Sequence, residues 1–326
     1  MAIVSIAQND SIRTAVEESI RLLGEIESLM KPDSNIVIKP NLVFGLPPFT
    51  GFTTDLPIVQ SIIELCQKRC TSDIIIAEGS GGINTELAYR ISGYTELAVK
   101  YDVKLVDLNE SPTTNVPVPS GQAVKELHVP KVILDCDVLI NVPKLKLYRH
   151  IPGKSDWASL AVKNLMGALP GKGEYSDTRS QGFCLELSQE FLTARGKYYH
   201  SSYRQWWTPS GEKKRIHENF AQGLADIHSV IKPTLNVIDA IIVSNDVDMT
   251  NTMGQDPFDL NTILASQDPL ALDCIAARIG GLNPFNIPYL KHAAEREIGE
   301  SDYNRIQILG TPLEAIIKTW ETESAI

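Results

Sequence analysis

The sequence predicts an α/β fold with a mostly parallel, doubly wound sheet and helices on both of its faces. Short apolar runs alternate along the chain with longer segments whose apolar residues recur at helical spacing, which is typical of strand-helix-strand units. The chain has 326 residues, 43% of them hydrophobic, and can bury a large core. We expect a first lobe at 1–168, an irregular insertion or lid at 169–214, and a second α/β lobe at 215–326 packed on the first.

The first lobe is predicted to alternate strands with helices. Its strands are short runs rich in Val, Ile and Leu, and its helices follow residues that favour N-caps. Loops are expected at 43–54, where one could cover a site, and at 109–121. Strands are predicted at 2–7, 35–38, 72–77, 103–108 and 137–142, and helices at 11–30, from Pro57 behind the cap Asp55, from Asn84 or Thr85, and from about Asp156 to 168.

The second lobe contains a strongly apolar helix. It is predicted to begin at Pro269, with Asp268 as its N-cap, and to run to about Gly280. Asp273 lies within it, and we expect its carboxylate to reach a cation or to face solvent. The remaining elements are helices at 215–231, 287–298 and 312–320, strands at 235–243, 262–265 and 306–309, and a polar loop at 244–259.

The charge balance narrows the class of partner. The formal net charge of -10 argues against general nucleic-acid binding, which needs a basic surface. No apolar run approaches the length of a membrane span, and the apolar start at 1–7 is too short for a signal peptide. We therefore expect a cytoplasmic protein that binds neither nucleic acid nor membrane.

The five cysteines do not suggest a disulfide framework, because their number is odd and their spacing wide. Cys66 and Cys70 lie four residues apart on a predicted helix and would share one face. They could form half of a metal site, but two small core residues are the simpler interpretation since no second pair exists. The sequence names no cofactor and predicts neither an intrinsic iron-sulfur cluster nor a structural zinc.

Polar side chains follow three predicted strands at the point where each strand ends. In an open parallel sheet these carboxyl ends meet on one side, where ligands bind. A lysine there can hold a carboxylate or phosphate by charge, and an asparagine by hydrogen bonding. The alternative is an ordinary solvated lysine at a strand end. The residues in these positions are Lys39, Asn41, Glu78, Lys144 and Lys146.

Glu78 enters a glycine-rich turn, Gly79-Ser-Gly-Gly82, that precedes a helix. It could act as a base or a metal ligand beside free backbone amides. The glycine spacing matches neither the Walker nor the dinucleotide-binding pattern, and a carboxylate there would repel a phosphate. The structural alternative is a tight turn in which a lysine neutralises Glu78.

Two polar groups interrupt apolar segments. Lys163 and Asn164 lie within the predicted helix near 160, and a partly buried lysine beside other cations has a lowered pKa and can act as a base or nucleophile. Alternatively, Lys163 covers apolar surface with its stem and keeps its head in water. Asp239 lies inside an apolar strand, so it needs a partner, in a site or in a buried pair with lysine.

Histidine has an ordinary pKa near neutrality, so each of the six histidines is a candidate general acid or base, and the choice of His217 among them follows from the family resemblance described below. No two of them have a recognised metal-binding spacing. His150 comes just after the segment of Lys144 and Lys146, whereas His128 and His292 are better explained as structural or solvated.

Five segments, taken together, resemble the family of proteins called domain of unknown function 362. They are Ile38-Lys-Pro-Asn-Leu42, Ala77-Glu-Gly-Ser80, Asn141-Val-Pro-Lys-Leu-Lys146, Ser159-Leu-Ala-Val-Lys-Asn-Leu-Met-Gly167 and Leu264-Ala-Ser-Gln-Asp-Pro-Leu-Ala-Leu-Asp273. The resemblance favours site roles for Lys39, Lys163 and His217, the last of which matches a recurrent family histidine.

The same resemblance implies a ferredoxin-like iron-sulfur module in many members, and this chain lacks the clustered cysteines that such a module needs. Members often carry a histidine nearer the two lysines, where this chain has Leu147 and Tyr148, and this departure argues against a metal role. The layout of the first half also resembles the N-terminal domain of nickel-pincer lactate racemases. Their lysine-tethered cofactor is not carried over, because the pocket residues cannot be matched one by one.

These observations predict an enzyme that acts on a small anionic organic substrate by proton transfer, as an epimerase, isomerase or lyase. Four lysines would hold the anion, with help from Asn41, Asn164 and Asp239, while Glu78 and His217 would exchange protons. We expect Lys39, Glu78, Lys144 and Lys163 to converge on one cleft. The rival is a protein without chemistry of its own, which binds a ligand or docks an acidic, ferredoxin-like partner through the same lysines.

Overall fold

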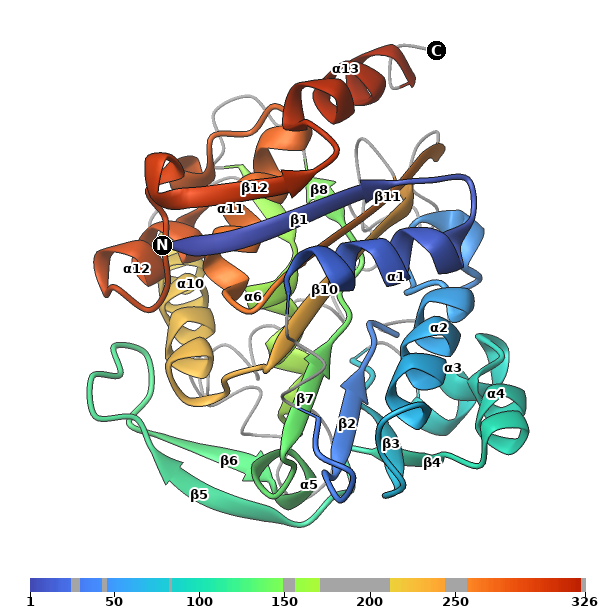
Figure 1. Cartoon of the computed structure of the whole chain (residues 1–326). Helices are drawn as coiled ribbons and strands as arrows, with labels where there is room; N and C mark the ends of the chain where they lie inside the picture. The colour runs from blue at the N-terminus through green and yellow to red at the C-terminus, as the bar shows by residue number, and fades with distance from the viewer. Residues whose placement is uncertain are drawn as a thin grey trace, which may run out of the picture.

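The computed structural model describes residues 1–24, 30–42, 46–81, 84–148, 156–170, 212–243 and 257–323. Its centre is a sheet of eight strands in the order β12-β1-β11-β10-β7-β2-β3-β4 (Figure 1). Only β11 is antiparallel to its neighbours in this sheet. The strands are β1 (Ala2–Gln8), β2 (Ile36–Lys39), β3 (Ile74–Glu78), β4 (Lys104–Asp107), β7 (Val138–Asn141), β10 (Leu235–Val243), β11 (Phe258–Ser266) and β12 (Ile306–Gly310).

Helices cover both faces of this sheet, and each face has its own apolar core. Alternate strand residues point to opposite faces, so Ile36 and Ile38 pack in one core while Val37 packs in the other. The first core takes side chains from α1 to α4, and the second from α6 and α10 to α13. The predicted α/β class, with its mostly parallel sheet, is confirmed. The helices are α1 (Ile12–Leu22), α2 (Leu56–Gln67), α3 (Thr85–Ile91), α4 (Tyr94–Tyr101), α5 (Lys131–Leu134), α6 (Ala161–Asn164), α10 (Glu212–Val230), α11 (Pro269–Ile279), α12 (Pro288–Glu295) and α13 (Leu313–Glu323).

Among the described residues, three short 3-10 turns join these elements and a fourth extends a helix. The one that matters for the site is η3 (Leu165–Ala168), which directly continues α6. The others are η2 (Pro48–Thr50), η5 (Pro284–Asn286) and η6 (Tyr303–Arg305).

Capping residues explain where several helices begin. Asn84 accepts a hydrogen bond from the amide of Leu87, and Asp268 accepts from the amides at Leu270 and Ala271, as predicted. Asp55 occupies the N-cap position of α2, but its carboxylate makes no capping hydrogen bond. That part of the prediction is wrong, because the carboxylate lies toward Lys144 instead.

Three loop and helix predictions are wrong. The helix expected at 11–30 ends at Leu22, where Gly24 takes a positive φ of 84° just beyond the cap. The predicted polar loop at 109–121 contains β5 (Thr113–Pro117), which pairs with β6 (Glu126–Pro130) in a hairpin that stands apart from the main sheet (Figure 1). Its polarity reflects exposure, since β5 buries none of its five residues. The helix expected from Asp156 begins only at Ala161, because β9 (Trp157–Ser159) pairs with β8 (Lys146–Tyr148).

The two predicted lobes contribute to one sheet, since β1 from the first pairs with β11 and β12 from the second. The division of the chain at 168 and 215 stays a prediction. Most of the predicted lid, at 171–211, lies outside the described residues. In the part of the chain that the structure describes, no helix combines the length and apolar character needed to cross a bilayer.

Candidate functional site

Four adjacent strands bring polar side chains to the carboxyl end of the sheet. Lys39 and Asn141 are the last residues of β2 and β7, and they stand opposite each other in the parallel ladder. Glu78 ends β3, and Lys144 forms an isolated parallel bridge with Asp239 of β10. Because β10, β7, β2 and β3 are consecutive in the sheet, their ends form one continuous polar region.

Lys39 and Glu78 form a buried ion pair. The Lys39 Nζ atom lies 2.8 Å from Glu78 Oε2 and donates to the carbonyl of Pro40 at 3.0 Å. The amide of Gly79 donates to Glu78 Oε1 at 3.0 Å. Glu78 is therefore held on both oxygens, which favours the interpretation in which a lysine neutralises it.

Gly167 of η3 packs directly over this pair. The amide of Gly79 donates to its carbonyl at 3.1 Å. A Cβ atom at position 167 would lie 2.5 Å from Glu78 Oε1 and 2.8 Å from Lys39 Nζ. Only a residue without a side chain fits there, so Gly167 lets the segment of α6 and η3 close onto the strand ends.

Lys144 lies between two carboxylates. Its Nζ atom is 2.9 Å from Asp239 Oδ1 and 3.6 Å from Asp55 Oδ2, and both Lys144 and Asp239 are fully buried. The amide of Asp55 donates to Asp239 at 2.8 Å. Burial and then the charge of Asp239 raise the pKa of Asp55 to about 6, against the opposing effect of Lys144. Asp55 Oδ2 has no hydrogen-bond partner among the described residues.

Lys146 begins a chain of buried amides. It donates to Asn41 Oδ1 at 2.5 Å; Asn41 then donates to Asn164 at 2.8 Å, Asn164 to Asn141 at 2.8 Å, and Asn141 to Asn236 at 2.9 Å. An ammonium has only donors, so Lys146 requires the oxygen of Asn41 to face it, and this orients every later amide. The chain ties the strand ends to α6 in one hydrogen-bonded arrangement.

Lys163 differs from the other three lysines. It lies on α6 and stays partly exposed, and no described residue forms an ion pair or hydrogen bond with its ammonium. Desolvation lowers its pKa to about 8. Burial, then the charges of Lys163 and Lys144, and more weakly that of Lys39, lower the pKa of Lys146 well below its ordinary value, while Glu78 opposes them.

Contacts among these residues and with the segment of α6 and η3 bring Lys39, Lys144, Lys146 and Lys163, here called the lysine cluster, together with Glu78 at one end of the sheet. Asn41, Asn164 and Asp239 join them through the contacts above. The side chain of His217 lies outside the described part of the structure, although its backbone belongs to α10. The chemical roles of these residues, and the cleft, stay predictions.

The segment of the chain that holds this site matches a known protein family. Residues 36–278, which span the whole lysine cluster, match the Domain of unknown function (DUF362). The chain belongs to the DUF362 family. It is 23% identical over 311 residues to the Thylakoid-associated protein sll1697 of Synechocystis sp., with 95% of this chain and 82% of that protein covered. The structure of the lactate racemase apoprotein from Thermoanaerobacterium thermosaccharolyticum matches with a TM-score of 0.42 and 14% identity, over 82% of this chain and 55% of that one.

Several residues of the DUF362 site were missed by sequence reasoning. Asn141 and Asn236 are polar residues in apolar strands, and the signal that singled out Asp239 would also have found them. Asp55 was assigned to a helix cap, and Gly167 carried no signal other than its place in a family motif. No group of three or more His, Cys, Asp or Glu side chains in the described ranges has a metal-binding arrangement.

The prediction that Asp273 reaches a cation or solvent is wrong. The residue is fully buried in α11, and its two oxygens accept from the amides of Ala161 at 2.7 Å and Val162 at 2.9 Å. Burial raises its pKa well above the ordinary value, while these two amides oppose the rise. Asp273 therefore fixes the start of α6, and with it the position of Lys163.

Proposed function

We propose that this DUF362 protein is an enzyme that binds a small organic carboxylate or phosphate and transfers a proton at a carbon beside the anionic group. Such a reaction would make it an epimerase, an isomerase or a lyase. The observation that carries the proposal is Lys163, a desolvated amine without a described counter-ion, placed beside the buried Lys146.

The charges of the lysine cluster are unevenly compensated. Lys39 and Lys144 have carboxylates at 2.8 and 2.9 Å. Among the described residues, Lys146 contacts no carboxylate and donates to the oxygens of Asn41 and Phe52, while Lys163 has no ion pair or hydrogen bond. An uncompensated buried cation costs several kcal/mol. The cost is relieved if the amine loses its proton or if an anion binds. An anionic substrate would therefore be attracted to this position.

Lys163 and Lys146, the two amines without a carboxylate among the described residues, suit two different steps. A neutral Lys163, with a pKa of about 8, can accept a proton from the substrate carbon. The electron pair left on that carbon delocalises into the adjacent carboxyl group, whose growing negative charge Lys146 and the amide chain would stabilise. Return of a proton to the other face would complete an epimerisation, and loss of a leaving group would complete an elimination.

The geometry changes our choice of the second group that would exchange a proton with the substrate. Glu78 is bound on both oxygens by Lys39 and Gly79, which suits it to orient Lys39. Asp55, with a pKa of about 6 and one oxygen without a hydrogen-bond partner among the described residues, is better suited to exchange a proton near neutral pH. We therefore add Asp55 to His217 as a proposed acid.

The burial of the cluster favours a bound small molecule over a docked protein. Lys39, Lys144 and Lys146 are each 3% exposed or less, so they do not present a basic surface to an acidic ferredoxin-like partner. A ligand-binding protein without catalysis remains the second candidate, because the same uncompensated charges would serve it. We place either function in the cytoplasm, since Cys66, Cys70, Cys136 and Cys274 are free thiols, as in reducing compartments.

Hydrogen-deuterium exchange at carbon tests the proposal without a known product. The protein is incubated in D₂O with small carboxylates that carry a C–H next to the carboxylate, and proton NMR follows loss of that C–H signal. We expect exchange with at least one compound, and its loss in Lys163→Met. Lys131→Met, at an exposed lysine of α5, is the matched control and should exchange as the wild type does. Saturable binding without exchange in any compound would favour the non-catalytic candidate.

A further inference from the structure

A second pocket lies at the opposite, amino end of the sheet. It has a volume of about 460 Å³, which falls in the roughly 300–1,000 Å³ range of small-molecule sites. Ile3 near the start of β1, Pro233 just before β10 and Ser266 at the end of the antiparallel β11 contribute to its wall. Because the parallel strands begin here and end at the lysine cluster, this amino-end pocket is separate from the site described above.

His228 is the unusual residue of this pocket. It lies in the last turn of α10, is 1% exposed, and lines the cavity. Neither ring nitrogen has a hydrogen-bond partner among the described residues. The backbone of Ile298 acts on the ring and raises its pKa, but the contact falls short of hydrogen-bond geometry. Burial dominates and lowers the pKa of His228 to about 3, so the ring is neutral, with one N–H to donate.

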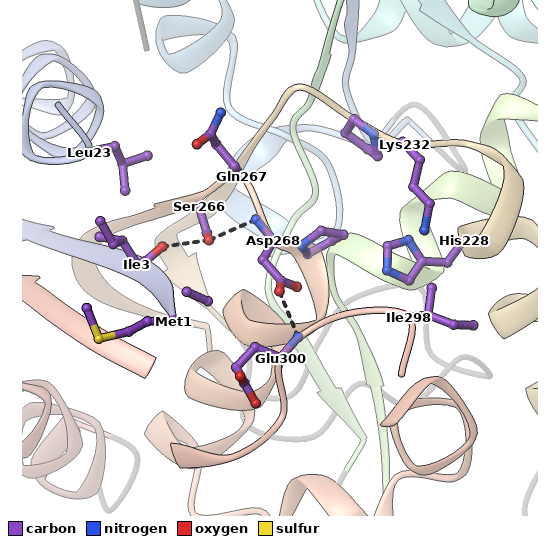
Figure 2. Close-up of a pocket in the computed structure, with 13 residues that line it drawn as sticks. Met1, Ile3, Leu23, His228, Lys232, Ser266, Gln267, Asp268, Ile298 and Glu300 are labelled. Carbon is purple, nitrogen blue, oxygen red and sulfur yellow. Dashed lines mark hydrogen bonds between the residues drawn. The ribbon is translucent and has the colours of Figure 1, made fainter. Parts of the chain in front are cut away.

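Lys232 supplies a positive charge beside this ring. Figure 2 shows its ammonium directed toward His228, and its charge contributes to the low pKa of the imidazole. No described residue forms an ion pair or hydrogen bond with Lys232, although the charge of Asp268 acts on it. A cation and a neutral N–H donor on one wall together suit an anionic oxygen, which can accept from both.

The acidic residues of the pocket are already engaged. Asp268 accepts from the amides of Leu270, Ala271 and Glu300. Glu300 accepts from two backbone amides of the next residues and pairs with Arg305 at 2.9 Å. These hydrogen bonds and the Arg305 ion pair satisfy the oxygens of both carboxylates, so neither needs a donor from a ligand.

Apolar side chains form a large part of the remaining wall, beside the polar Ser266 and Gln267. Figure 2 places Ile3, Leu23 and Met1 on the side of the pocket away from Lys232 and His228, with Ile298 below the ring. A phosphate or sulfate ion would leave this surface uncovered. A carboxylate with a short hydrocarbon chain would place its charge at Lys232 and its chain against the apolar wall.

We propose that the amino-end pocket binds a small aliphatic monocarboxylate, whose oxygens accept hydrogen bonds from Lys232 and from the N–H of His228. Binding would select the imidazole tautomer that presents its N–H to the cavity. It would also satisfy a buried polar ring that otherwise lacks a partner in the described structure. This inference does not rest on the proposed function of the lysine cluster.

Butyrate is the probe that tests this site. Two comparators are used: inorganic phosphate lacks the hydrocarbon chain, and butylamine lacks the negative charge. Imidazole nitrogen NMR follows His228 during titration, and the spectrum of His228→Leu assigns its signals. We expect a saturable shift of the His228 signals with butyrate and at least about tenfold weaker binding in Lys232→Met. Lys131→Met serves again as the matched lysine control and should bind butyrate as the wild type does.

The variant His228→Leu distinguishes a role of His228 in ligand binding from a role in the stability of the fold. Because neither ring nitrogen has a described hydrogen bond to lose, the variant should melt no lower than the wild type while losing butyrate binding. Unchanged His228 signals throughout the titration would overturn the proposal. Equal butyrate affinity in Lys232→Met and Lys131→Met, or tighter binding of phosphate or butylamine than of butyrate, would overturn it as well.

Discussion

Replacing Lys163 by methionine should have the opposite effect on stability from the same replacement at Lys39. Methionine keeps the length and apolar stem of lysine, so the packing change alone should be less than about 1.5 kcal/mol at either position. The difference lies in the charges. Lys39 neutralises the buried Glu78 at 2.8 Å, whereas Lys163 has no described partner and stands near Lys146.

The structure sets the size and sign of each effect. Lys39→Met leaves Glu78 buried and unpaired, which should cost about 3–5 kcal/mol. For Lys163, the pKa falls from 10.5 to about 8 on folding, so the charged form is disfavoured in the native state. The penalty is complete below about pH 8 and vanishes above the unfolded pKa. At 1.4 kcal/mol per pKa unit, reduced for partial exposure, Lys163→Met should stabilise the protein by about 1–3 kcal/mol at neutral pH.

Urea unfolding of both variants near pH 7 and near pH 10 measures these differences. The gain from Lys163→Met should shrink at the higher pH, because the wild-type amine is then neutral in the folded state and no longer buries a charge. Adding Glu78→Gln to Lys39→Met removes the buried charge and should recover much of the lost stability, which serves as the control. Equal destabilisation by both methionine variants would refute the reasoning, since it would mean that Lys163 also has a structural counter-ion.

Three further variants probe the supports of the site, each measured by urea unfolding. Gly167→Ala should cost about 1–3 kcal/mol, because its Cβ would meet Glu78 and Lys39 below 3 Å, and an unchanged midpoint would contradict that packing. Asp273→Ala should cost about 1–3 kcal/mol by leaving two buried amides of α6 unpaired; a loss no larger than that of an exposed Asp→Ala control would argue against this cap. Asp55→Asn should gain stability relative to the wild type as pH rises from about 4 to 6, because the folded-state pKa is raised and the carboxylate form is penalised; a pH-independent difference would count against it.

The sequence predicted the fold well because the signals for the fold are local. Short apolar runs gave the eight strands of the sheet, and the N-caps at Asn84 and Asp268 were readable from neighbouring residues. The β8–β9 pair and the hairpin β5–β6 were missed for a related reason. Their strands are three to five residues long and lack the continuous apolar run that marked the equally short β2 and β7, so neither periodicity nor composition separates them from a helix or a loop.

The residues of the candidate site could be predicted from the sequence, but the ion pairs and hydrogen bonds between them could not. The rule that parallel strands end on one side was enough to gather Lys39, Glu78 and Lys144. It could not say which lysine pairs with which carboxylate, because Lys144 and Asp239 are separated by 95 residues and meet only through the order of the strands. Asp273 was misassigned for the same reason, since its partners lie on another helix.

Two buried ion pairs and a chain of four amides at one end of the sheet are not explained by stability alone. Replacing a buried ion pair by apolar residues of similar volume is often neutral or stabilising, so the fold would gain little from keeping the lysine cluster as a structural device. The pairs do, however, hold Lys39 and Lys144 in fixed positions, and the amide chain fixes Lys146 relative to α6. What this arrangement provides is a rigid surrounding of buried hydrogen-bond donors for Lys163. A site with rigid donors and one uncompensated amine is what stabilising a developing negative charge requires, and this is why we favour catalysis over a purely structural role.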